Sequence, residues 1–182
     1  MHTATNKFTL LTEIGAGEFA HLNGSLQTHL IAVYELMRSW GANMTLCNAG
    51  LYHAAYGTSG YAEAMVSTDQ RLRIADIVGK EAEAIIYLYC ACDRDYVWPR
   101  IGPALPLPFK SRFTGKTDYL SLEQVKEFCE LTAANELQIA DADPAFAAQH
   151  SDLFRELFGR MAPYLSNPAI AFFHSVFGSF KK

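Results

Sequence analysis

The chain has 182 residues, of which 50% are hydrophobic and 19% are charged, and its net charge is −4. This length and balance predict a single packed domain spanning residues 1–182 and exclude a disordered chain. The acidic balance argues against nucleic acid and membrane as partners, and no stretch reaches the length of about 18 apolar residues that a membrane span needs.

The first half of the chain has the periodicity of helices. Apolar residues recur every three or four positions from Leu26 to Trp40, with Ser25 as a predicted N-cap and Gly41 as the stop. A second helix is expected over about 43–54. A third begins after Ser67 or Thr68 and is interrupted at Gly79, and the apolar run from Lys80 to Cys92 predicts a buried fourth helix.

Residues 93–120 have no helical period and hold four of the seven prolines, so we expect a long irregular loop there. A small hairpin around Thr114–Lys116 would fit within it. The loop carries Lys110, Arg112 and Lys116 among aromatic residues. It is expected either to act as a lid that contacts a phosphate or carboxylate, or to be an ordinary solvated loop.

Helical patterns resume in the second half. Ser121 and Gln124 match a capping box at the start of a helix that runs to about Asp141, where Asp143-Pro144 breaks it. Two further helices are expected near 151–161 and 168–177, the second capped by Asn167. The Phe-rich C-terminal segment is amphipathic, so it is expected either to dock on the core or to form a homodimer face. The fold class is all-α.

The cysteines and the N-terminus bear on the compartment. Four cysteines stand within apolar helical patterns, which predicts reduced core thiols: Cys47, Cys90, Cys92 and Cys129. The first residues lack the basic start and apolar run of a signal peptide. These features favour the cytoplasm.

Three histidines in the first third of the chain are the strongest candidates for chemistry. His29 lies on the first long helix and His53 near the end of the next, and two antiparallel helices joined at Gly41 would bring the two imidazoles together. Converging neutral imidazoles are good ligands for transition metals. His21 would either fold back over them or lie in a surface loop. The alternative is that each is a buried or surface histidine whose hydrogen bonds are satisfied.

The stretch "HLNGSLQTHLIAVYELMRSWGANMTLCNAGLYHAAYG" resembles the opening of an HD domain, the α-helical superfamily of metal-dependent phosphohydrolases. There, one histidine lies on a helix and a second on the next helix within A-x-L-x-H-D. The segment "TDQRLRIADIVGKEAEAIIYLYC" is similar to the part that follows in the HD hydrolases of guanosine tetraphosphate. The pattern is nearest to a divergent HD-like offshoot with H-L…W-G…A-G-L-x-H-x-x-Y-G-T. The resemblance covers about 20–135 and implies an HD-like helical bundle, with His29 and His53 at the two ligand positions.

This chain departs from that pattern at three places. Ala54 stands where HD domains have a bridging aspartate, and Asn135 is the counterpart of a late aspartate ligand. The acidic pair of the guanosine-tetraphosphate hydrolases is replaced by Tyr56-Gly57-Thr58. The resemblance therefore implies one divalent transition metal (Fe, Mn or Zn) held by His29, His53 and His21, or no metal at all, rather than a two-metal centre.

The expected function is metal-assisted hydrolysis of a small anionic, perhaps phosphorylated, metabolite. His29, His53 and Tyr56 would be the catalytic groups, and Tyr56 would share the face of His53 if the helix continued that far. The substrate would be bound by Arg71, Lys110, Arg112 and Asn135. Two alternatives stay open: a mononuclear iron oxygenase of HD-like type, and a non-catalytic protein that binds a small molecule.

Overall fold

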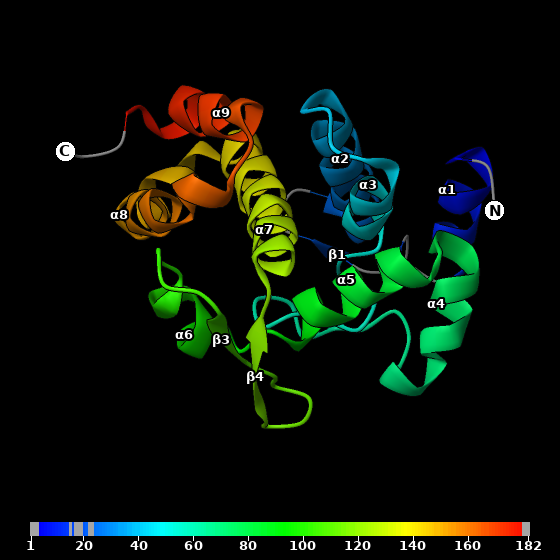
Figure 1. The fold of residues 1–182 in the computed structure, drawn as a ribbon. Helices are drawn as coiled ribbons and strands as arrows, with labels where there is room; N and C mark the ends of the chain where they lie inside the picture. Colours follow the sequence, from blue (N-terminus) through cyan, green and yellow to red (C-terminus); the bar gives the residue numbers. More distant parts are fainter. Residues whose placement is uncertain (1–3, 15, 17–19, 22–23, 180–182) are drawn as a thin grey trace. The chain divides into compact units, whose positions relative to one another are not determined.

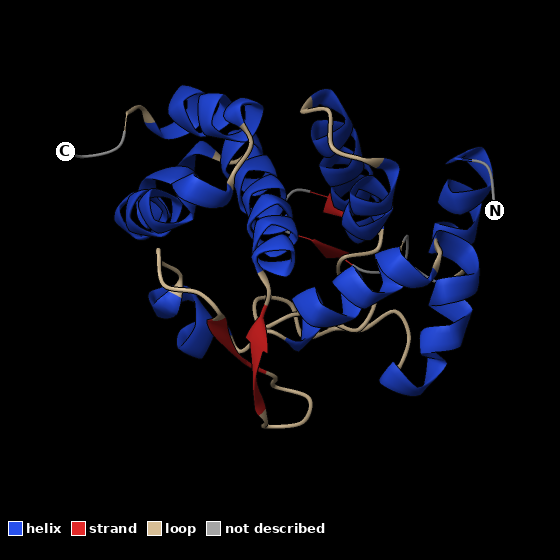
Figure 2. Ribbon diagram, viewed as in Figure 1, coloured by secondary structure: helices blue, strands red, loops and turns tan. Residues whose placement is uncertain are grey.

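The structure is a computed structural model that describes residues 4–14, 16, 20–21 and 24–179. It is mostly helical, as the sequence predicts, and the strands of the described part are confined to two short antiparallel pairs (Figure 2). The chain forms two compact units, Met1–Ala91 and Cys92–Lys182.

The first unit is built from helices α1 to α5 and one short strand pair (Figure 1). Strands β1 and β2 pair through Ala20 with Ser25 and His21 with Gly24. The elements are α1 (Ala4–Glu13), β1 (Ala20–His21), β2 (Gly24–Ser25), α2 (Leu26–Ser39), α3 (Met44–Leu51), the 3-10 turn η1 (Thr68–Gln70), α4 (Arg71–Val78) and α5 (Lys80–Ala91).

Helices α2 and α3 form the hairpin that the sequence predicts, and they lie side by side in Figure 1. Ser25 caps α2 by accepting a hydrogen bond from the backbone N–H of Thr28. Gly41 takes a positive φ of +79° at the connection, a conformation that side chains with a Cβ disfavour. The predicted extent of the second helix was wrong, because α3 ends at Leu51 and residues 52–56 form turns.

Helices α4 and α5 meet at a corner whose residue is Gly79, with φ +97°. Ile74, Ile77 and Val78 form the buried side of α4, as their spacing predicts. Ser67 occupies the N-cap position of the preceding turn η1, although its side chain makes no capping hydrogen bond. The corner brings the start of α4 close to the first turns of α5. Arg71 of α4 and Glu83 of α5 form an ion pair there.

The second unit holds the rest of the chain. Its elements are α6 (Arg94–Val97), the 3-10 turn η2 (Trp98–Arg100), β3 (Leu107–Lys110), β4 (Thr117–Leu120), α7 (Leu122–Ala142), α8 (Pro144–Met161), the 3-10 turn η3 (Ala162–Tyr164) and α9 (Asn167–Phe177). The region expected to be irregular thus contains a short helix and a hairpin, in which Phe109 pairs with Asp118. The hairpin around Thr114–Lys116 is confirmed.

The long helices of the second unit begin directly after residues whose side chains cap them. Ser121 and Gln124 form the predicted capping box of α7. Helix α8 begins at Pro144, earlier than predicted, because Asp143 accepts hydrogen bonds from two backbone N–H groups and the proline fits the first helical position. The predicted cap of α9 was wrong, since Ser166 rather than Asn167 accepts the capping hydrogen bond.

The aromatic side of the C-terminal helix docks within the second unit. Phe173 of α9 stacks on Phe158 of α8 at 4.7 Å between ring centroids, and Phe177 packs against Phe154 at 5.7 Å. The sequence left two roles open for this segment. The structure shows one of them for these side chains, since they dock on the core of the second unit.

All four cysteines are free and buried, as predicted. Burial raises the pKa of the Cys92 thiol to about 12, so this thiol stays protonated and poorly reactive at neutral pH. Among the described helices, none combines the length and the apolar character that crossing a membrane requires.

Candidate functional site

His29 and His53 meet in the first unit, as the sequence predicts. Their ring centroids lie 5.2 Å apart with an angle of 81° between the ring planes. His29 is 6% exposed and His53 is 2% exposed, so both imidazoles lie inside the unit. A buried imidazole of α2 and one from the turns after α3 therefore meet edge to face at this point.

The orientation of His53 is set by its backbone surroundings. Its Nδ1 lies 2.8 Å from the carbonyl oxygen of Gly50. A carbonyl oxygen can only accept, so Nδ1 donates to it, and in a neutral imidazole the lone pair is then on Nε2. Helix α5 supports the residue on another side, where the Cys90 thiol donates to the His53 carbonyl oxygen at 3.0 Å and the Tyr89 ring lies 5.6 Å away.

This arrangement fits part of a metal centre. An imidazole that donates its Nδ1 proton to a backbone carbonyl presents Nε2 as a ligand atom, which is the common arrangement of metal-binding histidines. Among the described residues, however, no group of three or more His, Cys, Asp or Glu side chains could hold a metal ion. The side chain of His21, the expected third ligand, lies outside the described residues. Ala54 is buried and brings no donor atom, so a bridged two-metal centre does not fit.

Tyr56 lies in the turns after α3 and binds a carboxylate. Its hydroxyl donates to Oε1 of Glu83 at 2.9 Å. Burial and this hydrogen bond to a carboxylate raise the pKa of Tyr56, so the hydroxyl stays protonated at neutral pH. His53 contacts α5 at Cys90, seven residues after Glu83, which is about 10 Å along a helix. Tyr56 therefore bonds to α5 about two turns away from the histidine pair, and its direct role in catalysis stays a prediction.

Arg71 is held by the same carboxylate. Its Nε and Nη2 donate to the two oxygens of Glu83 at 2.6 and 2.7 Å, and its guanidinium lies 3.8 Å from the centroid of the Tyr87 ring. The Arg71 side chain is 41% exposed while that of Glu83 is 7% exposed. The predicted anion-binding residue thus already has a bound carboxylate, and substrate binding by Arg71 would use its remaining N–H groups.

Glu83 is the residue that sequence reasoning missed. A carboxylate in the first turn of a helix is expected to interact with the helix dipole. In the structure, Glu83 joins Tyr56, Arg71 and α5 instead, and it is nearly fully buried. The signal in the sequence was the glycine corner at Gly79, which turns the chain so that the starts of α4 and α5 can meet.

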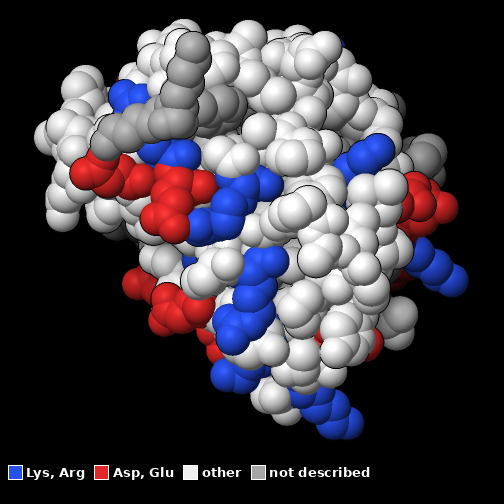
Figure 3. Space-filling view, turned by 60° about the vertical axis from the view of Figure 1, so that its left-hand side comes forward, with Lys and Arg blue, Asp and Glu red and all other residues white. Residues whose placement is uncertain are grey.

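The remaining predicted substrate-binding residues belong to the second unit. Lys110 of β3 forms an ion pair with Asp93 at 2.8 Å, and the guanidinium of Arg112 lies 4.6 Å from the ring centroid of Phe113. The hydrogen bond from Lys110 lowers the pKa of Asp93. On the face shown in Figure 3, Lys and Arg side chains are interspersed with Asp and Glu side chains, so that face carries both signs of charge.

Asn135 is buried near the middle of α7. Its Nδ2 donates to Oε1 of Glu136 at 3.0 Å. The same oxygen forms an ion pair with Arg94 at 2.9 Å. The three polar groups form one network within the second unit. A substrate contact by Asn135 stays a prediction.

A protein family described as "Domain of unknown function (DUF6817)" matches residues 10–94, just under half of the chain. The matched region includes the histidine pair and the whole contact between Tyr56, Arg71 and Glu83. No curated protein and no solved structure shows a significant match to the chain.

Proposed function

We propose that this protein is a divergent HD-like enzyme that uses His29 and His53 to hold one divalent transition metal and hydrolyses a small anionic metabolite. The observation that supports the proposal is the meeting of these two buried imidazoles at 5.2 Å, with Nδ1 of His53 on the Gly50 carbonyl oxygen. Zinc, iron and manganese all accept imidazole ligands. When bound, such an ion supplies a water of lowered pKa at neutral pH.

The residues of the chain have separate tasks in this proposal. The Gly50 carbonyl oxygen keeps the proton on Nδ1 of His53 and leaves Nε2 as the ligand atom. Burial keeps bulk water away from both rings. The half-exposed Arg71, fixed by Glu83 and Tyr87, offers its remaining N–H groups to an anionic part of the substrate.

A specific observation favours a second candidate, a small-molecule-binding protein without catalysis. Ala54 provides no donor beside His53, and the charge of Arg71 is already compensated by Glu83. A protein of that kind would retain the fold without needing a metal.

Elemental analysis tests the proposal. Untagged protein, purified without chelator, is compared with His29→Ala, His53→Ala and the control His150→Ala, whose ring packs on Phe146 at 4.4 Å in the second unit. About one equivalent of metal in the wild type and the control, lost in both site variants, would support the proposal. Zinc or manganese fits hydrolysis, whereas iron would favour the oxygenase alternative.

Absence of metal in the wild type after supplementation with each ion would refute the metal-dependent proposal and favour the binding protein. The variant Ala54→Asp tests whether the site has lost its metal or has been rebuilt around one. Metal bound only after this substitution would identify a hydrolase site that has lost its metal, and metal already bound by the wild type would identify a rebuilt one.

A further inference from the structure

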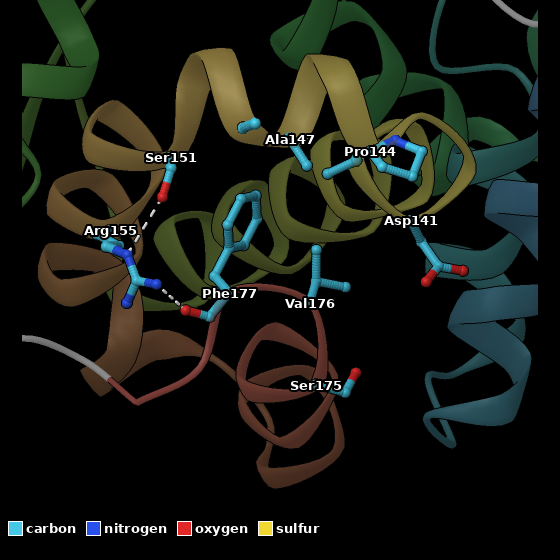
Figure 4. A pocket seen from close by; sticks show the side chains of 10 residues that line it. Asp141, Pro144, Ala147, Ser151, Arg155, Ser175, Val176 and Phe177 are labelled. Carbon is cyan, nitrogen blue, oxygen red and sulfur yellow. Dashed lines mark hydrogen bonds between the residues drawn. The ribbon is translucent and has the colours of Figure 1, made fainter.

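The second unit contains a cavity of about 420 Å³ formed by the end of α7, by α8 and by the end of α9 (Figure 4). This volume lies in the range of pockets that bind small molecules. The cavity is open to solvent and is independent of the histidine pair, because all of its lining residues belong to the second unit.

Arg155 provides a fixed cation at one side of the cavity. Its Nε donates to the Ser151 hydroxyl at 3.3 Å, Nη1 donates to the Ser179 carbonyl oxygen at 3.0 Å, and Nη2 donates to the Phe177 carbonyl oxygen. These bonds use three of the five N–H groups of a guanidinium and involve neutral acceptors. None of the ion pairs among the described residues includes Arg155. Its positive charge is therefore available to a carboxylate ligand.

Asp141 provides a negative charge at the other side. It lies in the last turn of α7, is exposed, and takes part in none of the ion pairs of the described residues. Figure 4 shows Asp141 and Arg155 on opposite sides of the pocket. Pro144 and Arg155 are eleven residues apart on α8, a rise of about 16 Å, so the two charges belong to the two ends of an elongated site.

The surface between the two charges carries apolar groups beside polar ones. Ala147 of α8 and the side chains of Val176 and Phe177 of α9 lie between Arg155 and Asp141 in Figure 4. Ala147 is one of the lining residues, and its side chain is small. These apolar groups can contact the hydrocarbon part of a ligand.

We propose that this cavity binds an elongated monocarboxylate with an apolar chain. Its carboxylate would lie at the free N–H groups of Arg155, and its far end, neutral or cationic, would lie toward Asp141. The carboxylate of Asp141 repels a second negative charge at that end, so dicarboxylates of the same length bind less tightly.

Binding of three six-carbon probes to the full chain tests this assignment by calorimetry or by NMR shift titration: hexanoate, 6-aminohexanoate and adipate. We expect 6-aminohexanoate to bind at least as tightly as hexanoate, and adipate to bind about fivefold more weakly. In Asp141→Asn, adipate should bind about as well as hexanoate.

Ala147→Leu, which fills the cavity, should abolish binding of all three probes, while Ala145→Leu, an exposed position of the same helix outside the lining, should leave binding unchanged. Arg155 also binds the end of α9, so Arg155→Lys is used with a check of the unfolding midpoint, and a folded variant should lose affinity. No binding of any probe by the wild type, equal binding of adipate and hexanoate, or unchanged binding in Ala147→Leu would each overturn the proposal.

Discussion

Arg71 and Glu83 form a two-point ion pair, at 2.6 and 2.7 Å, across the corner that Gly79 makes between α4 and α5. Tyr56 adds a third hydrogen bond to the same carboxylate from the turns that follow α3. One buried carboxylate thus joins three consecutive parts of the first unit. The contact fixes the chain segment that carries His53 relative to the helix that supports it.

Glu83→Gln should destabilise the protein by about 2 kcal/mol, because glutamine keeps one acceptor oxygen but loses the negative charge and the second acceptor that Arg71 uses. The estimate stays modest because the Arg71 side chain is 41% exposed and water can solvate it after the change. Urea unfolding gives the free energy. Glu81→Gln is the matched control on the exposed side of the same turn and should change stability by less than about 0.5 kcal/mol. Equal effects of the two variants would contradict the structural role of Glu83.

Tyr56→Phe should cost about 1 kcal/mol, since it removes one buried hydrogen bond and leaves the ion pair of Glu83 with Arg71 in place. Tyr61→Phe is the control, because the Tyr61 hydroxyl donates to exposed Glu63 two residues away. Thermal unfolding of both variants measures the difference. If Tyr56 is also a catalytic group, its variant should lose turnover by more than its stability loss explains, whereas a purely structural Tyr56 would leave turnover of the folded protein nearly intact.

Gly57 follows Tyr56 at a position where only glycine fits. Its φ is +68°, and a Cβ built there would lie 2.8 Å from the backbone oxygen of Ala62. Gly57→Ala should therefore destabilise the protein by more than about 3 kcal/mol, from the clash with backbone in addition to conformational strain. Gly41 has φ +79° with nothing within 4 Å of such a Cβ, so Gly41→Ala should cost only about 1 kcal/mol. Chemical unfolding of the pair separates the two contributions, and equal losses would contradict the predicted clash.

Local patterns in the sequence were enough to predict much of the helical framework. Ser25, Gly41 and the capping box of Ser121 and Gln124 act through hydrogen bonds and backbone conformations within a few residues, so one sequence reveals them. The early start of α8 at Pro144 is equally local, because Asp143 caps the helix and proline fits the first helical position as well as it ends the preceding helix.

In the candidate site, contacts within one helical hairpin were predictable from the sequence, whereas contacts between separate elements were not. The meeting of His29 and His53 follows from the length of one helical hairpin, so it was predictable. The partner of Arg71 depends on how α4 and α5 cross at Gly79, which periodicity does not encode. Glu130 of α7 is another case: its carboxylate is buried and accepts hydrogen bonds from the backbone and hydroxyl of Ser166, 36 residues later in the chain. Long-range partners of this kind require the packed structure.

The ion pair between Asp93 and Lys110 predicts a change of stability in acid. The hydrogen bond from Lys110 lowers the pKa of Asp93 in the folded chain below its ordinary value of 3.8. A group whose folded pKa is lowered contributes stability above its unfolded pKa and loses that contribution as the pH falls through the folded pKa. The contribution of Asp93 should therefore be complete near pH 6 and decline below about pH 4.

Asp93→Asn tests this dependence without removing the cap of α6, because asparagine is also a good N-cap residue. The wild type should be more stable than Asp93→Asn at pH 6, and the difference in the free energy of unfolding should shrink steadily between pH 4 and pH 2.5. Asp95→Asn, at an exposed neighbouring position, should show a small difference that does not change with pH. Urea unfolding at each pH gives the three curves, and other carboxylates titrate in all three proteins and cancel. A wild-type advantage that stayed constant down to pH 2.5 would show that the charge of Asp93 contributes nothing to the fold.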